Sequence, residues 1–255
     1  MKYWTLGRRL PRKLFTLLFG DREHYGLDIK SDDEDWIKWQ DFYVTFYKAT
    51  QKQGIGNLVN EAGYTILDKV SFTGKSILEI GPGLMPHTKF WRSLPQEYVI
   101  VDINEDLLEG SKEILLQKNV NVRPLRISSS DLPVATDSID IILSFFNLEH
   151  LRPLDQYLNE LHRILKPGGL FVGAIPCEGG IAWGVGRFLT ARRFAHKNSS
   201  INYDKIICWE HPNFANEILI ACDSIFTPLE KDFWPFGQSI IDINLVARFI
   251  YQKGQ

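Results

Sequence analysis

Cysteine is scarce in this sequence. Its 255 residues include three cysteines, at positions 177, 208 and 222. They are odd in number, far apart and without the spacing of metal ligands, so we expect reduced thiols and no metal site. This usage favours a reducing, cytoplasmic compartment.

Long apolar runs are also missing. No stretch reaches the ~18 apolar residues of a membrane-spanning helix. Basic residues among the first 13 positions precede the short apolar run Leu14–Phe19, but a signal peptide would need a longer run and a small-residue cleavage site. We expect either a segment that rests on an anionic membrane or lipid substrate, or a solvated or lid-forming terminal helix.

An excess of charge of one sign is absent as well. The formal net charge is −2, whereas nucleic-acid-binding proteins usually carry a strong basic excess, so no nucleic-acid partner is expected. Hydrophobic residues make up 44% and charged residues 24%, which is typical of a globular protein with a full core. The length suits one α/β domain with extra segments.

From residue 76 onward, strand and helix signals alternate. The short apolar runs are typical of parallel strands buried on both faces, and the alternation predicts a doubly wound sheet with right-handed crossovers. Two later runs, Phe226–Trp234 and Ile241–Tyr251, look like an antiparallel pair that closes the sheet. The predicted strands are Ser76–Ile80, Tyr98–Val101, Val120–Leu125, Ile139–Phe145 and Leu170–Ile175, with helices at Glu105–Gln117 and Leu154–Leu165.

Two segments flank or interrupt this pattern. Residues 1–72 read as a helical, aromatic-rich cap or lid, and residues 73–255 as the main domain with an insertion at about 176–208. Within the insertion, residues 176–200 are glycine-rich and predicted to be loop-like. Its basic residues Arg187, Arg192 and Arg193 either neutralise an anionic group of a substrate or form a solvated surface.

The strongest signal for a binding site is the run Ile77–Gly83. An apolar strand leads into a turn with Gly81 and Gly83, where a Cβ would keep a ligand from the backbone; a helix is predicted to begin near Pro86. Asp102 ends the second strand, where a carboxylate can accept hydrogen bonds from two ribose hydroxyls. Together these features predict a cofactor that contains adenosine.

Two residues decide between adenosine cofactors. A dinucleotide site usually has Gly-x-Gly-x-x-Gly, but Pro86 occupies the sixth position here. Glu79, in the strand before the turn, would repel phosphate and suit the cationic sulfonium and ammonium groups of S-adenosyl-L-methionine. The alternatives are that Glu79 is a structural group bonded to turn amides, and that the protein is a nicotinamide-dependent oxidoreductase.

Four segments follow one another in order: Ser76–Gly83, Tyr98–Asp102, Leu132–Pro133 with Ser138–Ile142, and Leu161–Gly169. Together they resemble the successive motifs of class I S-adenosylmethionine-dependent methyltransferases, in the branch called methyltransferase type 11. The resemblance covers about residues 76–176. It implies a Rossmann-like, seven-stranded, mostly parallel sheet with a C-terminal antiparallel hairpin.

The same resemblance implies the cofactor contacts. Glu79, Gly81 and Gly83 would hold the methionine part and Asp102 the ribose, with Ile103 beside it. This chain departs from the family at Met85, where a third glycine is common. It departs again near the end of the third strand, where family members often carry an acidic residue that contacts adenine. The candidates for the adenine contact are Ser128, which matches that position, and Asp131.

The loop after the fourth strand lies over the transferable methyl group in this topology. Asn147 is therefore a candidate cofactor contact, and Glu149 and His150 are candidate catalytic residues. His211, beside Glu210, and His87 are alternative bases, while His150 has the alternative of a packing or helix-entry role.

The sequence does not identify the acceptor molecule. An aromatic cap favours a small-molecule, glycan or lipid-like substrate over a protein or nucleic acid. Trp209–His211 and Phe233–Phe236 resemble bacterial methyltransferases of cell-surface glycan or lipid biosynthesis. A non-enzymatic alternative is a methyltransferase-like protein that binds S-adenosylmethionine without catalysis. The departures from the family pattern at Met85 and Ser128 favour this alternative.

Overall fold

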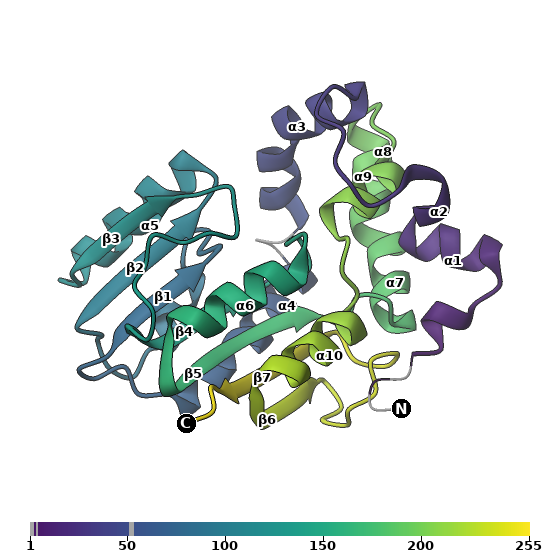
Figure 1. Cartoon of the computed structure of the whole chain (residues 1–255). Helices are drawn as coiled ribbons and strands as arrows, with labels where there is room; N and C mark the ends of the chain where they lie inside the picture. The colour runs from purple at the N-terminus through teal and green to yellow at the C-terminus, as the bar shows by residue number, and fades with distance from the viewer. Residues whose placement is uncertain (1–2, 4, 51–53) are drawn as a thin grey trace.

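The computed structural model describes residue 3, residues 5–50 and residues 54–255, with the backbone alone at residues 44, 47–50, 54 and 55. Positions 1–2, 4 and 51–53 of the predicted N-terminal cap lie outside the described residues. Within the described part, seven strands form one sheet in the order β3-β2-β1-β4-β5-β7-β6 (Figure 1). The strands are β1 Ser76–Ile80, β2 Glu97–Asp102, β3 Val122–Arg126, β4 Ile139–Phe145, β5 Leu165–Pro176, β6 Thr227–Trp234 and β7 Val246–Gln252.

The sheet has the predicted topology. Strands β3, β2, β1, β4 and β5 pair in parallel, and β7 pairs antiparallel with both β5 and β6. The parallel order reverses between β1 and β4, which is where ligands of such sheets bind. The predicted fold class and the closing hairpin are therefore confirmed.

Helices cover both faces of the sheet. One face packs against α6 (Leu154–Ile164) and α10 (Ala215–Ile225), and the other against α4 (Gly54–Tyr64), η2 (Thr65–Lys69) and α5 (Glu105–Gln117). Central strand residues such as Ile77, Leu78 and Ile142 are fully buried. Burial on both faces explains why their strands read as continuous apolar runs.

Six further helices form a layer at the carboxyl ends of β4 and β5, which we call the cap (Figure 1). They come from two distant parts of the chain, and α1 packs on α7 and α9 while α3 packs on α8 and α9. The predicted segment 1–72 thus divides between the cap and the helices α4 and η2 on the sheet. The cap helices are α1 Arg12–Phe19, α2 Arg22–Tyr25, α3 Glu34–Thr50, α7 Ile181–Arg187, α8 Arg193–Asn198 and α9 Tyr203–Glu210.

The prediction of a loop over residues 176–200 was wrong. This segment holds α7, a π-helical turn at Phe188–Arg192 and α8. Gly184 lies inside α7 because a Cβ there would meet the Phe19 ring at 2.8 Å and the Leu18 Cβ at 3.1 Å. The glycine thus serves close packing of α7 on α1. The helix predicted near Pro86 is a five-residue 3-10 helix, η3 (Pro86–Phe90).

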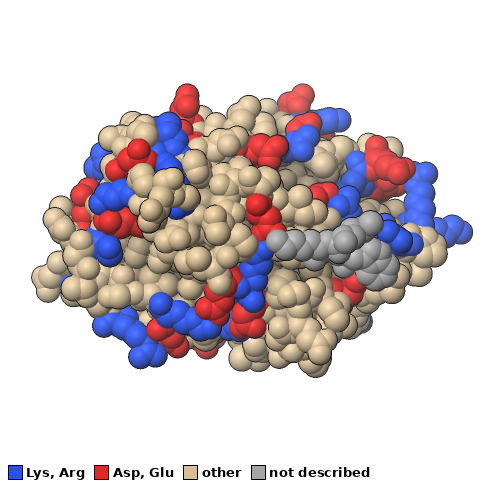
Figure 2. All heavy atoms as spheres, turned by 60° about the horizontal axis from the view of Figure 1, so that its bottom comes forward, with Lys and Arg blue, Asp and Glu red and all other residues tan. Residues whose placement is uncertain are grey.

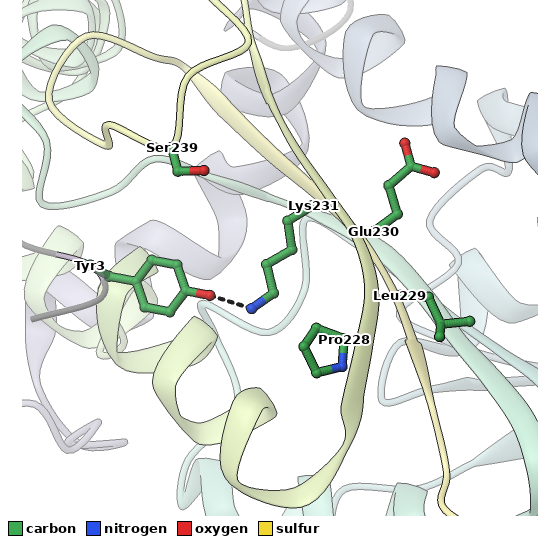
Figure 3. A pocket seen from close by; sticks show the side chains of 6 residues that line it. All are labelled: Tyr3, Pro228, Leu229, Glu230, Lys231 and Ser239. Atoms are coloured by element: carbon green, nitrogen blue, oxygen red, sulfur yellow. Dashed lines mark hydrogen bonds between the residues drawn. The ribbon is translucent and has the colours of Figure 1, made fainter.

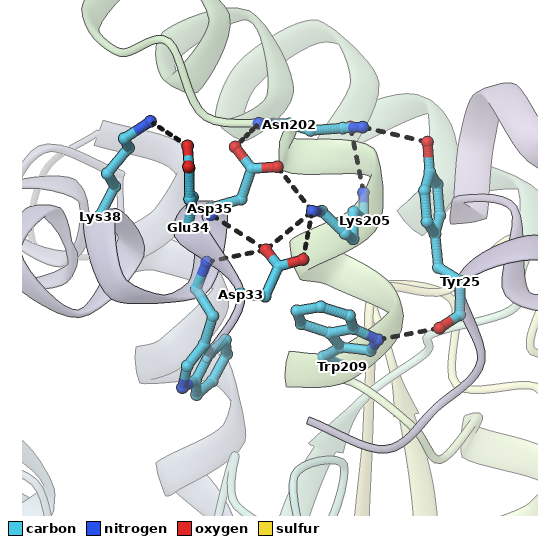
Figure 4. Close-up of polar contacts among 9 residues, drawn as sticks. Tyr25, Asp33, Glu34, Asp35, Lys38, Asn202, Lys205 and Trp209 are labelled. Carbon is cyan, nitrogen blue, oxygen red and sulfur yellow. Dashed lines mark hydrogen bonds and ion pairs between the residues drawn. The ribbon is translucent and has the colours of Figure 1, made fainter. Parts of the chain in front are cut away.

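Polar contacts hold the two parts of the cap together (Figure 4). The Lys205 ammonium on α9 donates to both oxygens of Asp33, at 2.7 and 2.8 Å, and lies 2.7 Å from Asp35. The Trp209 indole N–H donates to the Tyr25 carbonyl at 3.2 Å. Because these groups lie at the start of α3 and along α9, they fix the N-terminal helices on the insertion.

Tyr3, Leu6 and Gly7, among the described residues near the N-terminus, are also anchored. Asp242, in the connection between β6 and β7, accepts the amides of Leu6 and Gly7 at 2.6 and 2.9 Å. The Tyr3 hydroxyl donates to Asp223 at 2.9 Å and contacts the Lys231 ammonium beside a hollow of about 250 Å³ (Figure 3). Among the described residues, no helix is long and apolar enough to cross a membrane.

Two glycines of α7 give a matched test of this packing. We expect Gly184→Ala to lower the free energy of unfolding by about 1–3 kcal/mol, because the new methyl overpacks against a fully buried Phe19. Gly186 has open space around its Cβ position within the described structure, so Gly186→Ala should stabilise by about 0.5–1 kcal/mol. Urea unfolding measures both; equal effects of the two variants would contradict the packing.

Candidate functional site

The glycine turn follows β1 directly. Gly81 and Gly83 have φ of 69° and 58°, values that favour glycine. The Gly81 amide donates to Val101 at 2.9 Å and the Ser111 hydroxyl donates to the Gly83 carbonyl at 2.6 Å. Met85 also has a left-handed backbone, with φ 47°, and its side chain is buried in the core. The turn therefore keeps a left-handed residue at the position where a third glycine is common.

Glu79 lies beneath this turn and is 1% exposed. The Tyr98 hydroxyl donates to its Oε2 at 2.6 Å, and the His87 Nε2 lies 3.1 Å from its Oε1. The structural partners of Glu79 are thus a hydroxyl and an imidazole rather than turn amides. His87 is itself buried among aromatic rings, including Tyr64 and Phe145, which places this alternative base out of reach of solvent.

The carboxyl end of β2 carries Asp102. Its Oδ1 accepts the amide of Asn104 at 2.9 Å, which holds the carboxyl group at the strand's edge, and burial raises its pKa although backbone hydrogen bonds oppose the shift. Ile103 is 64% exposed. Ser128 and Asp131, the two candidates for an adenine contact, are both exposed in the loop after β3.

The loop after β4 reaches back to the glycine turn. Asn147 lies so close to Gly81 that a Cβ on the glycine would be 2.4 Å from the Asn147 Oδ1. Within the described residues, the buried Asn147 Nδ2 has no hydrogen-bond partner. The Asn147 side chain thus fills the space that a Cβ of Gly81 would take, and its unsatisfied amide, with the Asp102 carboxylate on the neighbouring strand, offers polar groups that suit an adenosine-bearing ligand.

Beyond Asn147, ionisable side chains gather where the cap meets the sheet. The rings of His150 and His211 lie 4.7 Å apart at 88°. His150 Nδ1 contacts the Glu210 carbonyl at 2.6 Å, and the His211 Nδ1 lies 3.1 Å from Glu178 Oε2. Three predicted catalytic residues, Glu149, His150 and His211, are thus brought into one cluster. The His150 amide donates to the Asn147 carbonyl at 3.0 Å, which places this cluster one turn from Asn147.

Glu178 and Glu149 are both buried in this cluster, but their pKa values are shifted in opposite directions. Burial raises the pKa of Glu149 to about 7, with nearby His150 opposing the shift. Burial also acts to raise the pKa of Glu178, but the hydrogen bond with His211 and the charges of Arg187 and Arg22 outweigh it and hold that pKa well below its usual range. At neutral pH Glu178 is therefore ionised, while Glu149 is close to its midpoint.

Glu178 is a site residue that the sequence motifs do not predict. A usable signal exists, because Glu178 follows β5 as Asp102 ends β2, and polar residues at the carboxyl ends of parallel strands face the ligand edge of the sheet. The basic residues of the insertion have structural partners: Arg187 donates to the Leu18 carbonyl and Arg192 makes two 2.7 Å bonds to Asp204. Arg193 is exposed.

Two hollows among the described residues lie away from this cluster. One is the hollow beside Tyr3 (Figure 3). The other, of about 400 Å³, lies at the amino ends of β4 and β5, lined in part by Asp140 and Lys166. Neither adjoins the glycine turn, and parallel sheets bind ligands at the opposite edge.

Part of this sequence matches a known protein family. A family model described as a methyltransferase domain matches residues 78–173, which span the glycine turn, Asp102 and the loop after β4. Residues 78–173 of this chain therefore match a methyltransferase domain, as the sequence motifs predict.

Individual relatives are more distant. The ubiquinone/menaquinone biosynthesis C-methyltransferase UbiE of Vibrio campbellii is 27% identical over 166 residues, covering 60% of this chain and 63% of that one. The malonyl-[acyl-carrier protein] O-methyltransferase of Buchnera aphidicola is 27% identical over 165 residues, covering 63% and 64%. The chain therefore spans under two thirds of these methyltransferases.

A solved structure supports the fold. The PH0226 protein of Pyrococcus horikoshii superimposes with a TM-score of 0.56 at 16% identity, covering 84% of this chain and 98% of that protein. At this identity the likeness concerns the fold alone.

The raised pKa of Glu149 has a consequence for stability. Up to about pH 7 the folded chain holds a proton that the unfolded chain releases near pH 4.5, so Glu149 should cost stability as pH rises through this window. Glu149→Gln removes the effect. The difference in unfolding free energy between variant and parent should move in the variant's favour by roughly 3 kcal/mol between pH 4.5 and 8.

Urea unfolding at the two pH values measures this shift. Glu109→Gln, on α5 and 53% exposed at its side chain, is the matched control and should differ little from the parent at either pH. A Glu149→Gln variant with the same relative stability at both pH values would show that this carboxyl group ionises normally.

Proposed function

We propose that this protein transfers a methyl group from S-adenosyl-L-methionine to a small-molecule, glycan or lipid-like acceptor held between the cap and the carboxyl ends of β4 and β5. The observation that carries the proposal is the cluster of His150, His211 and Glu178 one turn from Asn147, whose side chain touches Gly81. Donor turn and acceptor cluster thus adjoin at the edge where the strand order reverses.

In this proposal the methionine part of the donor lies along the turn at Gly81 and Gly83, beside the Asn147 side chain that packs on Gly81. The Asp102 carboxylate accepts the ribose hydroxyls, with Ile103 against the nucleoside, and Asn147 offers its amide. Glu79 acts from below the turn, where its negative charge favours the sulfonium over a phosphate. Ser128 and Asp131 remain the candidates for adenine.

The donor, when bound, supplies a methyl group on a good leaving group. The protein's contribution is therefore alignment and water exclusion, and orientation of reacting groups can lower a barrier by roughly 7–11 kcal/mol. The cap provides both, since α3 and α9 place Trp39 against Glu210, with the indole N–H donating at 2.8 Å. A site bordered by packed cap helices suits a small or chain-like acceptor.

The names of the two relatives support this acceptor class in kind, because one concerns quinone biosynthesis and the other malonyl-[acyl-carrier protein]. Peripheral membrane contact through the N-terminus is part of the proposal. Leu14 and Leu17 on α1 are 48% and 38% exposed beside the exposed Lys13, a pattern that suits an interface. On the face shown in Figure 2, basic and acidic side chains are interspersed, which is unlike a nucleic-acid surface.

Donor binding is tested with S-adenosylhomocysteine, the product of the donor. At 100 times its dissociation constant it should add about 2.7 kcal/mol to the stability of the protein. Asp102→Ala should weaken its binding by about 10- to 100-fold, since a carboxylate hydrogen bond contributes about 1.5–3 kcal/mol. Isothermal titration calorimetry measures the affinity.

The matched control is Asp106→Ala, an exposed aspartate four residues on, which should bind as the parent does. Stabilisation by NAD and not by S-adenosylhomocysteine would contradict the proposal. Tight binding without methyl transfer to any cell fraction would favour the non-catalytic alternative.

A further inference from the structure

His211 is held through both its ring and its backbone. Its Nδ1 lies 3.1 Å from Glu178 Oε2. Its own carbonyl accepts the Arg22 Nη2 at 2.6 Å, and the Arg22 guanidinium lies 3.6 Å from the centre of the Phe214 ring. Neither the ring nor its backbone can turn without breaking a contact to a buried charge.

Glu178 is well suited to hold an imidazole in one tautomer. Its side chain is fully buried and also contacts the Trp183 indole N–H, and it stays ionised at neutral pH. An ionised carboxylate only accepts hydrogen bonds, so Nδ1 of His211 is the nitrogen that donates to it, and in the neutral ring the lone pair then lies on Nε2. Within the described residues no hydrogen bond occupies Nε2, and the ring is 17% exposed.

We propose that His211 Nε2 is the general base of the methyl transfer, that Glu178 is its positioning residue, and that the acceptor atom is a hydroxyl oxygen, which loses its proton as it is methylated. The substrate class is a phenol, sugar or other alcohol, and the product is a methyl ether. This inference rests on the proposed function. A carboxylate acceptor has no proton to lose, so it would leave such a base without a role.

The step balances without another reactant. The acceptor oxygen forms a bond to the methyl carbon, and the carbon–sulfur bond breaks with its electron pair passing to sulfur. The hydroxyl proton moves to His211 Nε2, so the positive charge of the sulfonium becomes that of an imidazolium beside the Glu178 carboxylate. Water takes this proton after the product leaves.

The other ionisable groups of the cluster fit the base less well. Glu149 is 2% exposed, which leaves no approach for an acceptor. His150 Nδ1 contacts the backbone carbonyl of Glu210, and the carboxylate of that residue lies farther away, at 3.5 Å, where it already accepts the Trp39 indole. A carbonyl can orient an imidazole but neutralises an imidazolium less than a carboxylate does.

The tautomer can be tested without any substrate. Nitrogen-15 NMR of histidine-labelled protein at pH 8 should show His211 with a protonated Nδ1 and an unprotonated Nε2, assigned with His211→Ala. In Glu178→Gln the preference should weaken, because the carboxamide can both donate and accept. A protonated Nε2 in the parent protein would overturn the proposal.

The product class is tested with a labelled methyl donor and fractionated lipids and glycans from cells. An ether keeps its label in mild alkali and releases it as iodomethane in hot hydriodic acid. Alkali-labile label would be an ester, and label resistant to both would be bound to carbon or nitrogen; either result overturns the inference while the proposed function stands. If no fraction takes up label, the proposed function fails and this inference with it.

Variants of His211 and Glu178 are then assayed on the labelled fraction. His211→Ala should lower kcat by about 10²–10⁴-fold and leave the affinity for S-adenosylhomocysteine unchanged, whereas His196→Ala, an exposed histidine on α8, should have no effect. Glu178→Asp keeps the charge and should retain more kcat than Glu178→Gln, which keeps the shape. A more active Gln variant, or an effect of His211→Ala on KM alone, would contradict the roles assigned.

Discussion

The arrangement of the site depends on the burial of one ionised carboxylate at the end of β5. Glu178 contacts His211 from the connection between α9 and α10 and Trp183 from α7, and it lies in the field of Arg22 and Arg187. A buried carboxylate is costly unless it is paired and hydrogen-bonded. The cap helices that carry these partners are therefore held against the edge at which sheets of this topology bind ligands.

The glycine turn after β1 depends on the backbone conformation of a few residues. Gly81 allows the Asn147 side chain to lie where a Cβ would be, and this contact couples the donor turn to the loop that carries Glu149 and His150. Met85 shows that the turn tolerates a departure from the family pattern, because its left-handed backbone is combined with a buried side chain that fills the core. Packing offsets a strain that glycine would avoid.

The sheet could be predicted from the sequence because its signals are local. Strands β1 and β4 and helix α5 begin and end where the apolar periodicity predicts, and burial of both faces makes such runs unambiguous. The cap could not be predicted in this way. Gly184 and Gly186 suggested a loop, yet Gly184 serves a contact with Phe19 from a distant part of the chain. Glu178 was missed for the same reason, since its partners come from separate segments and only the fold brings them together.

The most direct test of the account is a crystal structure of the protein with S-adenosylhomocysteine. The account predicts the ligand along the turn from Gly81 to Gly83, with its ribose hydroxyls on the Asp102 carboxylate and its sulfur facing the cluster of His150 and His211. Ligand density at another place, with the space beside this turn filled by protein side chains, would contradict it.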